Sequence, residues 1–260
     1  MIELVACDID GTLLHAGEKE ISPEVFEQIG RLQKKGIIFC PASGRQYYSL
    51  HRLFAPIVDM LYFICNNGAI LFGPDKGGDI SERILSTTAL PRKQAESFCN
   101  YILSRNCFEL VVSGKFTDYI CPKKIDLTEH LESIGYNVAR VAKPEDIPED
   151  ILKVTAFCED GTGPFFKELT DLWGGNYRVA VSGEKWIDVT LSDKGAGLSS
   201  ICKILNIPIQ NVMAIGDNYN DLQMLNIVGH AVVMENAAEE IKLRFSKQCR
   251  RVEDVLAELT

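Results

Sequence analysis

The sequence lacks the features of a membrane protein and of a nucleic-acid-binding protein. Its apolar runs are short and broken by charged residues, whereas a membrane-spanning helix needs roughly 18 or more apolar residues in succession. No basic stretch precedes an apolar one at Met1-Ile2-Glu3-Leu4-Val5, so we expect no export signal. Positive charge is also scarce, because 27 Lys and Arg stand against 36 Asp and Glu for a net charge of −9. Since phosphate backbones attract basic surfaces, we expect a soluble globular protein that binds neither nucleic acid nor membrane.

Paired cysteines and clustered histidines are missing as well. The nine cysteines are an odd number, and no two have the two-residue spacing of a zinc or thioredoxin-like pair. The histidines, at positions 15, 51, 130 and 230, are scattered, so we assign none of them to a metal. We therefore expect reduced thiols in a cytoplasmic chain. The sequence leaves the oligomeric state open.

Short apolar runs alternate with helical patterns at both ends of the 260-residue chain. Residues 2–7 form the first run, Ser22-Pro23 opens a helix, and residues 37–40 form the next run. Such a strand, helix, strand order predicts parallel strands covered by helices. The alternation returns near the other end, with strands expected at residues 186–191, 212–215 and 230–233, each followed by a helix.

The middle of the chain has a different pattern. Alternating runs at residues 108–112 and 177–181 are interspersed with helical stretches at 95–103 and 165–172, which favours an α+β unit with an antiparallel sheet. We predict a Rossmann-like α/β core with a parallel sheet from residues 1–82 and 187–260, and an inserted α+β domain from residues 83–186.

Polar clusters follow the predicted core strands. Asp8 and Asp10 follow the first strand, Ser43-Gly44-Arg45 the second, and Gly216-Asp217 with Asn220-Asp221 a late one. Ligands of open α/β sheets bind beyond the carboxyl ends of the strands, so these clusters should converge. Carboxylates about 4 Å apart repel by about 1 kcal/mol per pair even in water, and more where they are partly buried. They need a cation, and oxygen ligands without histidine or cysteine favour Mg²⁺.

The same clusters resemble the four motifs of the haloacid dehalogenase superfamily. Asp8-Ile9-Asp10-Gly11-Thr12-Leu13-Leu14 is similar to the first motif, Ser43-Gly44-Arg45 to the second, Lys194 to the third, and residues 216–221 to the fourth. Asn67-Gly68-Ala69, Met234 with Asn236-Ala237, and an insertion between the second and third motifs make the chain similar to the Cof-type (subclass IIB) phosphatases. In that family the inserted domain is a cap.

The resemblance implies a role for each motif residue. Asp8 would be the nucleophile that forms an aspartyl-phosphate, and Asp10 the general acid and base. Mg²⁺ would be held by the carboxylates of Asp8 and Asp217 and by the backbone carbonyl of Asp10. The remaining motif residues would grip the phosphate or support its ligands: Ser43, Gly44, Lys194 and Asn220 at the phosphate, with Asp221, Arg45 and Thr12 behind them.

These roles imply a Mg²⁺-dependent phosphatase for small phosphorylated metabolites such as sugar phosphates. Two alternatives stay open: a sugar phosphomutase that uses the same nucleophile, and a regulatory module that binds a phosphometabolite without turning it over. Outside the motifs, Asn66-Asn67-Gly68 is typical of a hairpin turn. We interpret Ser182-Gly183-Glu184 as a loop without a ligand rather than as a substrate-facing segment. No motif identifies the substrate.

Overall fold

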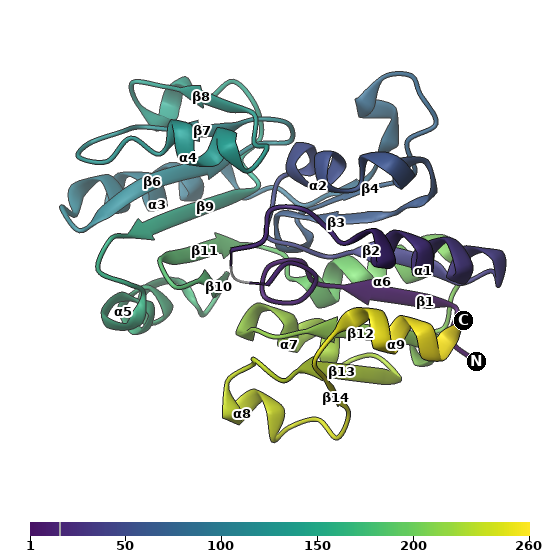
Figure 1. Ribbon diagram of the computed structural model, residues 1–260. Helices are drawn as coiled ribbons and strands as arrows, with labels where there is room; N and C mark the ends of the chain where they lie inside the picture. Colours follow the sequence, from purple (N-terminus) through teal and green to yellow (C-terminus); the bar gives the residue numbers. More distant parts are fainter. Residues whose placement is uncertain (16) are drawn as a thin grey trace.

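The computed structural model describes residues 1–15 and 17–260 and contains a parallel sheet at its centre (Figure 1). The strand order is β14-β13-β12-β1-β2, and every neighbouring pair is parallel. The strands are β1 (Leu4–Cys7), β2 (Ile38–Pro41), β12 (Val212–Gly216), β13 (His230–Met234) and β14 (Gln248–Cys249). The predicted α/β core is confirmed.

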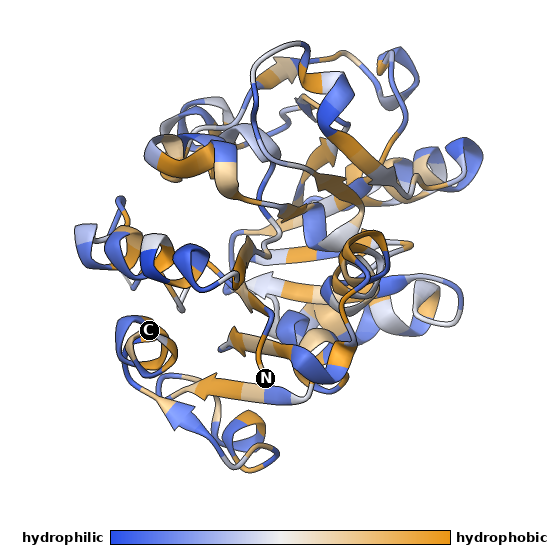
Figure 2. Cartoon of the chain, turned by 90° about the vertical axis from the view of Figure 1, so that its right-hand side faces the viewer, coloured by the Kyte–Doolittle hydropathy of each residue, from blue (hydrophilic) through white to orange (hydrophobic). Residues whose placement is uncertain are grey.

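Helices cover both faces of this sheet. They are α1 (Pro23–Lys34), α2 (Tyr47–Leu53), α6 (Lys194–Leu205), α7 (Leu222–Leu225), α8 (Glu239–Lys242) and α9 (Val252–Leu259). Successive strand residues point to opposite faces, so Val5 packs in the apolar cluster beneath α1 and α9, whereas Leu4 packs in the cluster beneath α6 and α7. Figure 2 shows the resulting concentration of hydrophobic residues on the strands. At α1, the predicted start is confirmed, because Ser22 Oγ accepts the backbone N–H of Val25 and Pro23 is the first helical residue.

A small antiparallel sheet extends the core. It consists of β3 (Phe63–Cys65), β4 (Ile70–Phe72) and β5 (Ile84–Thr87). The predicted turn between β3 and β4 is confirmed: Asn66, Asn67 and Gly68 have φ angles of 48°, 53° and 88°, which suit asparagine and glycine. The 3₁₀ helices along the chain are η1 (Ala55–Met60), η2 (Asn66–Gly68), η3 (Ile80–Arg83), η4 (Pro144–Asp146), η5 (Ile209–Asn211) and η6 (Tyr219–Asp221).

The inserted domain contains a six-stranded sheet in the order β10-β11-β9-β6-β7-β8. Its strands are β6 (Phe108–Ser113), β7 (Asp118–Ile120), β8 (Val138–Arg140), β9 (Lys153–Cys158), β10 (Arg178–Gly183) and β11 (Trp186–Thr190), and its helices are α3 (Arg92–Ser104), α4 (Thr128–Ser133) and α5 (Gly163–Trp173). All pairs are antiparallel except β7 with β8. Residues of α3 and α5 pack in the apolar cluster on one face, and residues beside and within α4 pack on the other.

One predicted strand lies in the other sheet. We expected residues 186–191 to begin the second piece of the core, but β11 pairs with β9 and β10. Residues 187–190 therefore belong to the sheet of the inserted domain, and the chain returns to the core just before α6. A short apolar strand fits either sheet by composition, and antiparallel pairing with β9, distant in the sequence, as well as with β10 decides which sheet it joins.

Two further sequence predictions concern the cysteines and the C-terminal segment. All nine cysteines are unpaired, and eight of them are buried. The helix expected from about residue 237 is the short α8, and β14 and α9 follow it, which the sequence pattern did not predict. Across residues 1–15 and 17–260, the helices are too short and too polar to cross a bilayer.

Candidate active site

Three carboxylates meet beyond the carboxyl ends of β1 and β12. Asp8 follows β1, Asp217 follows β12, and Asp221 ends η6. Because β1 and β12 are neighbours in the parallel sheet, their ends lie side by side. One ligand oxygen from each of the three residues lies within 4.8 Å of the others. The structure thus brings together residues of the first and fourth predicted motifs.

Lys194 supplies the positive charge between these carboxylates. It is the first residue of α6 and is 1% exposed. Its Nζ donates to Asp8 Oδ1 at 2.5 Å and to Asp221 Oδ1 at 2.6 Å. Burial alone would lower the pKa of Lys194, but attraction to Asp221 and Asp8 raises it. The lysine is therefore charged.

One ammonium does not balance the negative charge of the cluster. Burial raises the pKa of Asp8, repulsion from Asp221 adds to this, and Lys194 opposes it. Burial and the charge of Asp221 also raise the pKa of Asp217, to about 6. Burial is the main cause of both shifts and repulsion from Asp221 adds to it, so a further positive charge would stabilise the ionised carboxylates. An all-oxygen donor set suits a hard divalent ion such as Mg²⁺. The residues present therefore fit the predicted metal.

The Asp221 carboxylate holds the loop that follows β12. Its Oδ1 accepts from Lys194, and its Oδ2 accepts the backbone N–H groups of Asp217 at 3.0 Å and Asn218 at 2.9 Å. Asn218 and Asp221 together form a capping box around η6. The carboxylate oxygens still available to a cation therefore belong mainly to Asp8 and Asp217.

The turn after β1 fits closely around Asp217. Thr12 Oγ1 donates to Asp217 Oδ1 at 3.0 Å, and Asn236 Nδ2 lies 3.3 Å from Asp217 Oδ2. Gly11 has a φ of +88°, and a Cβ there would lie 2.3 Å from Asp217 Oδ2. The glycine is required both by the turn and by the approach of the carboxylate.

Asp10 lies at the exposed edge of the site and is held by Arg45. The Nε and Nη2 atoms of Arg45 donate to the two Asp10 oxygens at 2.8 and 2.5 Å. The Asp10 side chain is 52% exposed, so it is open to solvent and to the cavity. Ser43, which is buried after β2, accepts the backbone N–H of Arg45 at 3.2 Å. The second motif therefore lies next to the first.

A buried polar chain joins the core to the inserted domain. Asn220 Nδ2 donates to Asn67 Oδ1 at 3.2 Å, and Asn67 Nδ2 donates to Asp188 Oδ2 at 2.7 Å. Lys153 Nζ, from β9, donates to the carbonyl of Gly44 at 2.8 Å and lies 3.5 Å from Asp188 Oδ2. Sequence reasoning missed Lys153, Asp188 and the role of the Asn67 side chain. A charged residue inside an apolar strand, as at Ile187-Asp188-Val189, is the signal that could have indicated Asp188.

These residues line a cavity of about 470 Å³ between the core and the inserted domain. From the core it receives Asp8, Asp10, Ser43, Gly44 and Asn220. From the inserted domain it receives Ser182, Gly183 and Glu184, so this segment does line the cavity, although we interpreted it as a loop away from any ligand.

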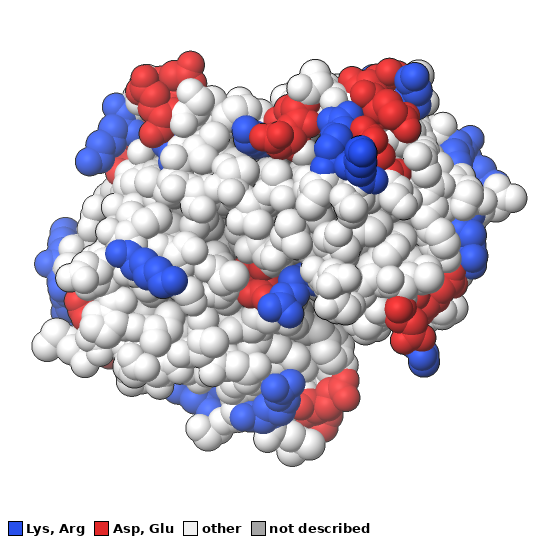
Figure 3. Space-filling model, turned by 180° about the vertical axis from the view of Figure 1, so that it is seen from behind, with Lys and Arg blue, Asp and Glu red and all other residues white. Residues whose placement is uncertain are grey.

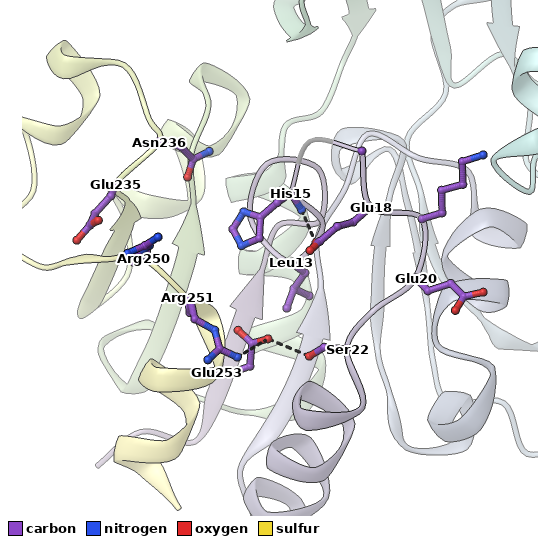
Figure 4. A pocket seen from close by; sticks show the side chains of 12 residues that line it. Leu13, His15, Glu18, Glu20, Ser22, Glu235, Asn236, Arg250, Arg251 and Glu253 are labelled. Atoms are coloured by element: carbon purple, nitrogen blue, oxygen red, sulfur yellow. Dashed lines mark hydrogen bonds and ion pairs between the residues drawn. The ribbon is translucent and has the colours of Figure 1, made fainter.

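A wider hollow of about 980 Å³ lies between residues 13–15 and 17–22 on one side and the C-terminal segment on the other (Figure 4). Two of its charged groups pair with each other: Arg251 lies 3.4 Å from Glu253, which also accepts from Ser22 Oγ. None of the metal-cluster carboxylates lines it. On the face shown in Figure 3, acidic and basic side chains are interspersed.

Comparison with known proteins agrees with this geometry. Residues 5–256 match the haloacid dehalogenase-like hydrolase family, and the chain belongs to that family. Its core, inserted domain and site make it a phosphatase of the Cof type, as the sequence predicts.

Relatives cover nearly the whole chain. The 5-amino-6-(5-phospho-D-ribitylamino)uracil phosphatase YbjI of Escherichia coli is 28% identical and matches 92% of this chain and 88% of its own. The HMP-PP phosphatase of Serratia proteamaculans is 26% identical and matches 93% and 87%. A haloacid dehalogenase-like hydrolase from Bacillus subtilis has the same fold, with a TM-score of 0.86 at 22% identity over the full length of both chains.

Proposed function

We propose that this phosphatase hydrolyses small phosphate monoesters with Mg²⁺, through a phosphorylated Asp8. The observation that carries the proposal is the position of the buried Asp8 carboxylate beyond the carboxyl end of β1. Lys194 donates to this carboxylate, and an oxygen of Asp217 lies close enough to bind the same metal ion as Asp8. We further propose that the protein works in the cytoplasm, which its nine unpaired cysteines support.

Asp8 and Asp10 divide the reaction into two displacements. An Asp8 oxygen forms a bond to phosphorus while the ester P–O bond breaks, and the leaving oxygen takes a proton from Asp10. Asp10 then removes a proton from water, whose oxygen bonds to phosphorus as the Asp8–phosphorus bond breaks and inorganic phosphate leaves. Arg45 orients Asp10 by binding both of its oxygens.

Other groups hold the phosphate during both displacements. The Ser43 hydroxyl, the Gly44 backbone N–H and the Lys194 ammonium donate to its oxygens, and Asn220 lies at its edge. Asp8, Asp217 and the Asp10 carbonyl would hold Mg²⁺. The ion, when bound, supplies positive charge that offsets the repulsion between Asp8 and the phosphate dianion.

The cavity limits the size of the substrate. A volume of about 470 Å³, enclosed by two domains, suits a metabolite and excludes a folded phosphoprotein. YbjI and the HMP-PP phosphatase are named for phosphorylated metabolites, which supports this class of substrate.

The test is phosphate release from 4-nitrophenyl phosphate by the wild type, by Asp8→Asn and by a control variant, Asp171→Asn, whose carboxylate is exposed on α5. We expect Mg²⁺-dependent release that EDTA stops, that Asp8→Asn abolishes and that the control retains. Full activity of Asp8→Asn or in EDTA would refute the proposal. If ¹⁸O from labelled water failed to enter the phosphate while a sugar phosphate isomerised, the phosphomutase would replace it.

A further inference from the structure

The cavity has two chemically different halves. Its core half carries the charged motif residues, whereas its other half has a wall of apolar and aromatic side chains beside polar residues of the inserted domain. The following residues form this apolar wall: Val111, Leu131, Ile134, Tyr136 and Trp186, all of which pack in one apolar cluster, with His130 beside them. A leaving group attached to a phosphate on the core lies between the core and this wall.

Three charged groups of the inserted domain that line the cavity, those of Asp188, Lys153 and Asp118, are already bonded to protein. Asp188 accepts from Asn67 and from Thr155 Oγ1, the latter at 2.6 Å. Lys153 donates to the Gly44 carbonyl, and Asp118 lies 3.4 Å from Gln46 Nε2. A polyhydroxylated leaving group that packs against the apolar wall would have to break these bonds or bury hydroxyls without partners, which costs free energy.

Two rings of the apolar wall stack on one another. The planes of His130 and Trp186 lie 15° apart, with their centroids separated by 6.1 Å. Phe157 supports the indole from a neighbouring strand, with a centroid distance of 4.8 Å. Gly183 faces the indole edge, where a Cβ would lie 3.1 Å from Cδ1, so the backbone packs against the ring and fixes its position.

We infer that the leaving group of the substrate is a planar, aromatic or heteroaromatic ring, and that Trp186 is the residue that selects it, with His130 at its side. This inference rests on the proposed phosphatase activity of the same site. A flat ring buries its faces against the indole and needs few hydrogen bonds, while Tyr136, Ser182 and Glu184 can bind polar substituents at its edge. A sugar also packs on indole, but the hydroxyls that it turns toward the apolar wall would be buried there without partners, which costs free energy.

The kinetic test compares three esters on the wild type and on Trp186→Leu: 4-nitrophenyl phosphate, glucose 6-phosphate and glycerol 3-phosphate. We expect the wild type to have its lowest KM for the nitrophenyl ester. Trp186→Leu should raise that KM about ten-fold, in line with the loss of one stacking contact, and leave the KM for glycerol 3-phosphate within about two-fold. Phe165→Leu, which alters an aromatic residue packed on Phe108 outside the cavity, is the matched control.

A binding measurement separates stacking from turnover. Trp173→Phe leaves Trp186 as the only tryptophan, and Asp8→Asn in the same chain stops hydrolysis. Quenching of Trp186 fluorescence by 4-nitrophenyl phosphate, but not by glycerol 3-phosphate, is expected.

Each other outcome has one meaning. A Trp186→Leu variant that changes all three KM values alike, or none of them, overturns the inference. A lower KM for glucose 6-phosphate than for the ring ester in the wild type overturns it as well, and so does the absence of quenching. A wild type that hydrolyses no ester refutes the proposed function itself.

Discussion

At the residue scale, Asp118 is a buried acid with an unusual protonation state. It begins β7, is 1% exposed and lies beside Gln46 of the core. Burial raises its pKa to about 7, although attraction to Lys153 opposes the shift. The folded protein therefore keeps this proton at pH values where the unfolded chain has lost it.

This shift predicts how stability depends on pH. Between about pH 4 and pH 7 the folded state binds more protons at Asp118 than the unfolded state, so the contribution of this group falls as pH rises, by up to about 1.4 kcal/mol per pH unit, and levels off above pH 7. Asp118→Asn should remove that slope. Urea unfolding of both proteins from pH 5 to pH 8 measures it.

The control for this prediction is Asp171→Asn, which replaces an exposed carboxylate and should leave the slope unchanged. Parallel pH profiles for the wild type and Asp118→Asn would mean that Asp118 is ionised in the folded state across this range.

At the scale of single elements, the start of α6 determines where Lys194 lies. Asp193 is the N-cap, and its Oδ1 accepts the backbone N–H of Ala196 at 2.8 Å. The next residue is Lys194, so the cap fixes the helical turn that directs its ammonium to Asp8. Close packing of α6 against η2 helps, because a Cβ on Gly197 would lie 2.9 Å from the Gly68 Cα.

Loss of this cap should therefore destabilise the protein. We expect Asp193→Ala to lower the free energy of unfolding by about 1 kcal/mol, because one N–H at the helix start loses its acceptor. Asp193→Asn keeps an acceptor and should retain most of the stability. Equal losses in the two variants, measured by urea unfolding, would assign the effect to the ion pair with Arg178 at 3.1 Å instead.

At the scale of the whole molecule, the two sheets meet through buried polar contacts at the cavity. Lys153 binds the Gly44 carbonyl on the predicted phosphate loop, and Asn67 on the core binds Asp188 on β11. These contacts position the inserted domain over Asp8 and Asp10, and they position the loop that carries Ser43.

We expect Lys153→Met to lower kcat/KM for every ester by roughly ten- to a hundred-fold, because small displacements of positioned groups cost that much in rate. A melting curve shows whether the variant is folded at the assay temperature. Lys115→Met is the matched control, since Lys115 lies in the same domain but pairs with Asp150 at the surface. Activity of Lys153→Met equal to that of the control would show that the contact with Gly44 does not position the loop.

The sequence by itself determined the parallel core and the residues at its strand ends. Apolar runs of strand length that alternate with helices predict a parallel sheet. Because β1 and β12 are neighbours in that sheet, Asp8, Asp217 and Asp221 lie together at its carboxyl edge. The sequence also predicted the turn at Gly11, because the geometry of a turn depends on residues that are neighbours in the sequence.

Only the tertiary structure decided the rest of the cavity. Whether β11 joined one sheet or the other depended on antiparallel pairing with β9, a strand some thirty residues away with no motif to mark it. The same pairing places Trp186 opposite Phe157 and Asp188 opposite Thr155. Register across strands is set by packing over long separations, so residues that meet there carry no shared signal along the chain.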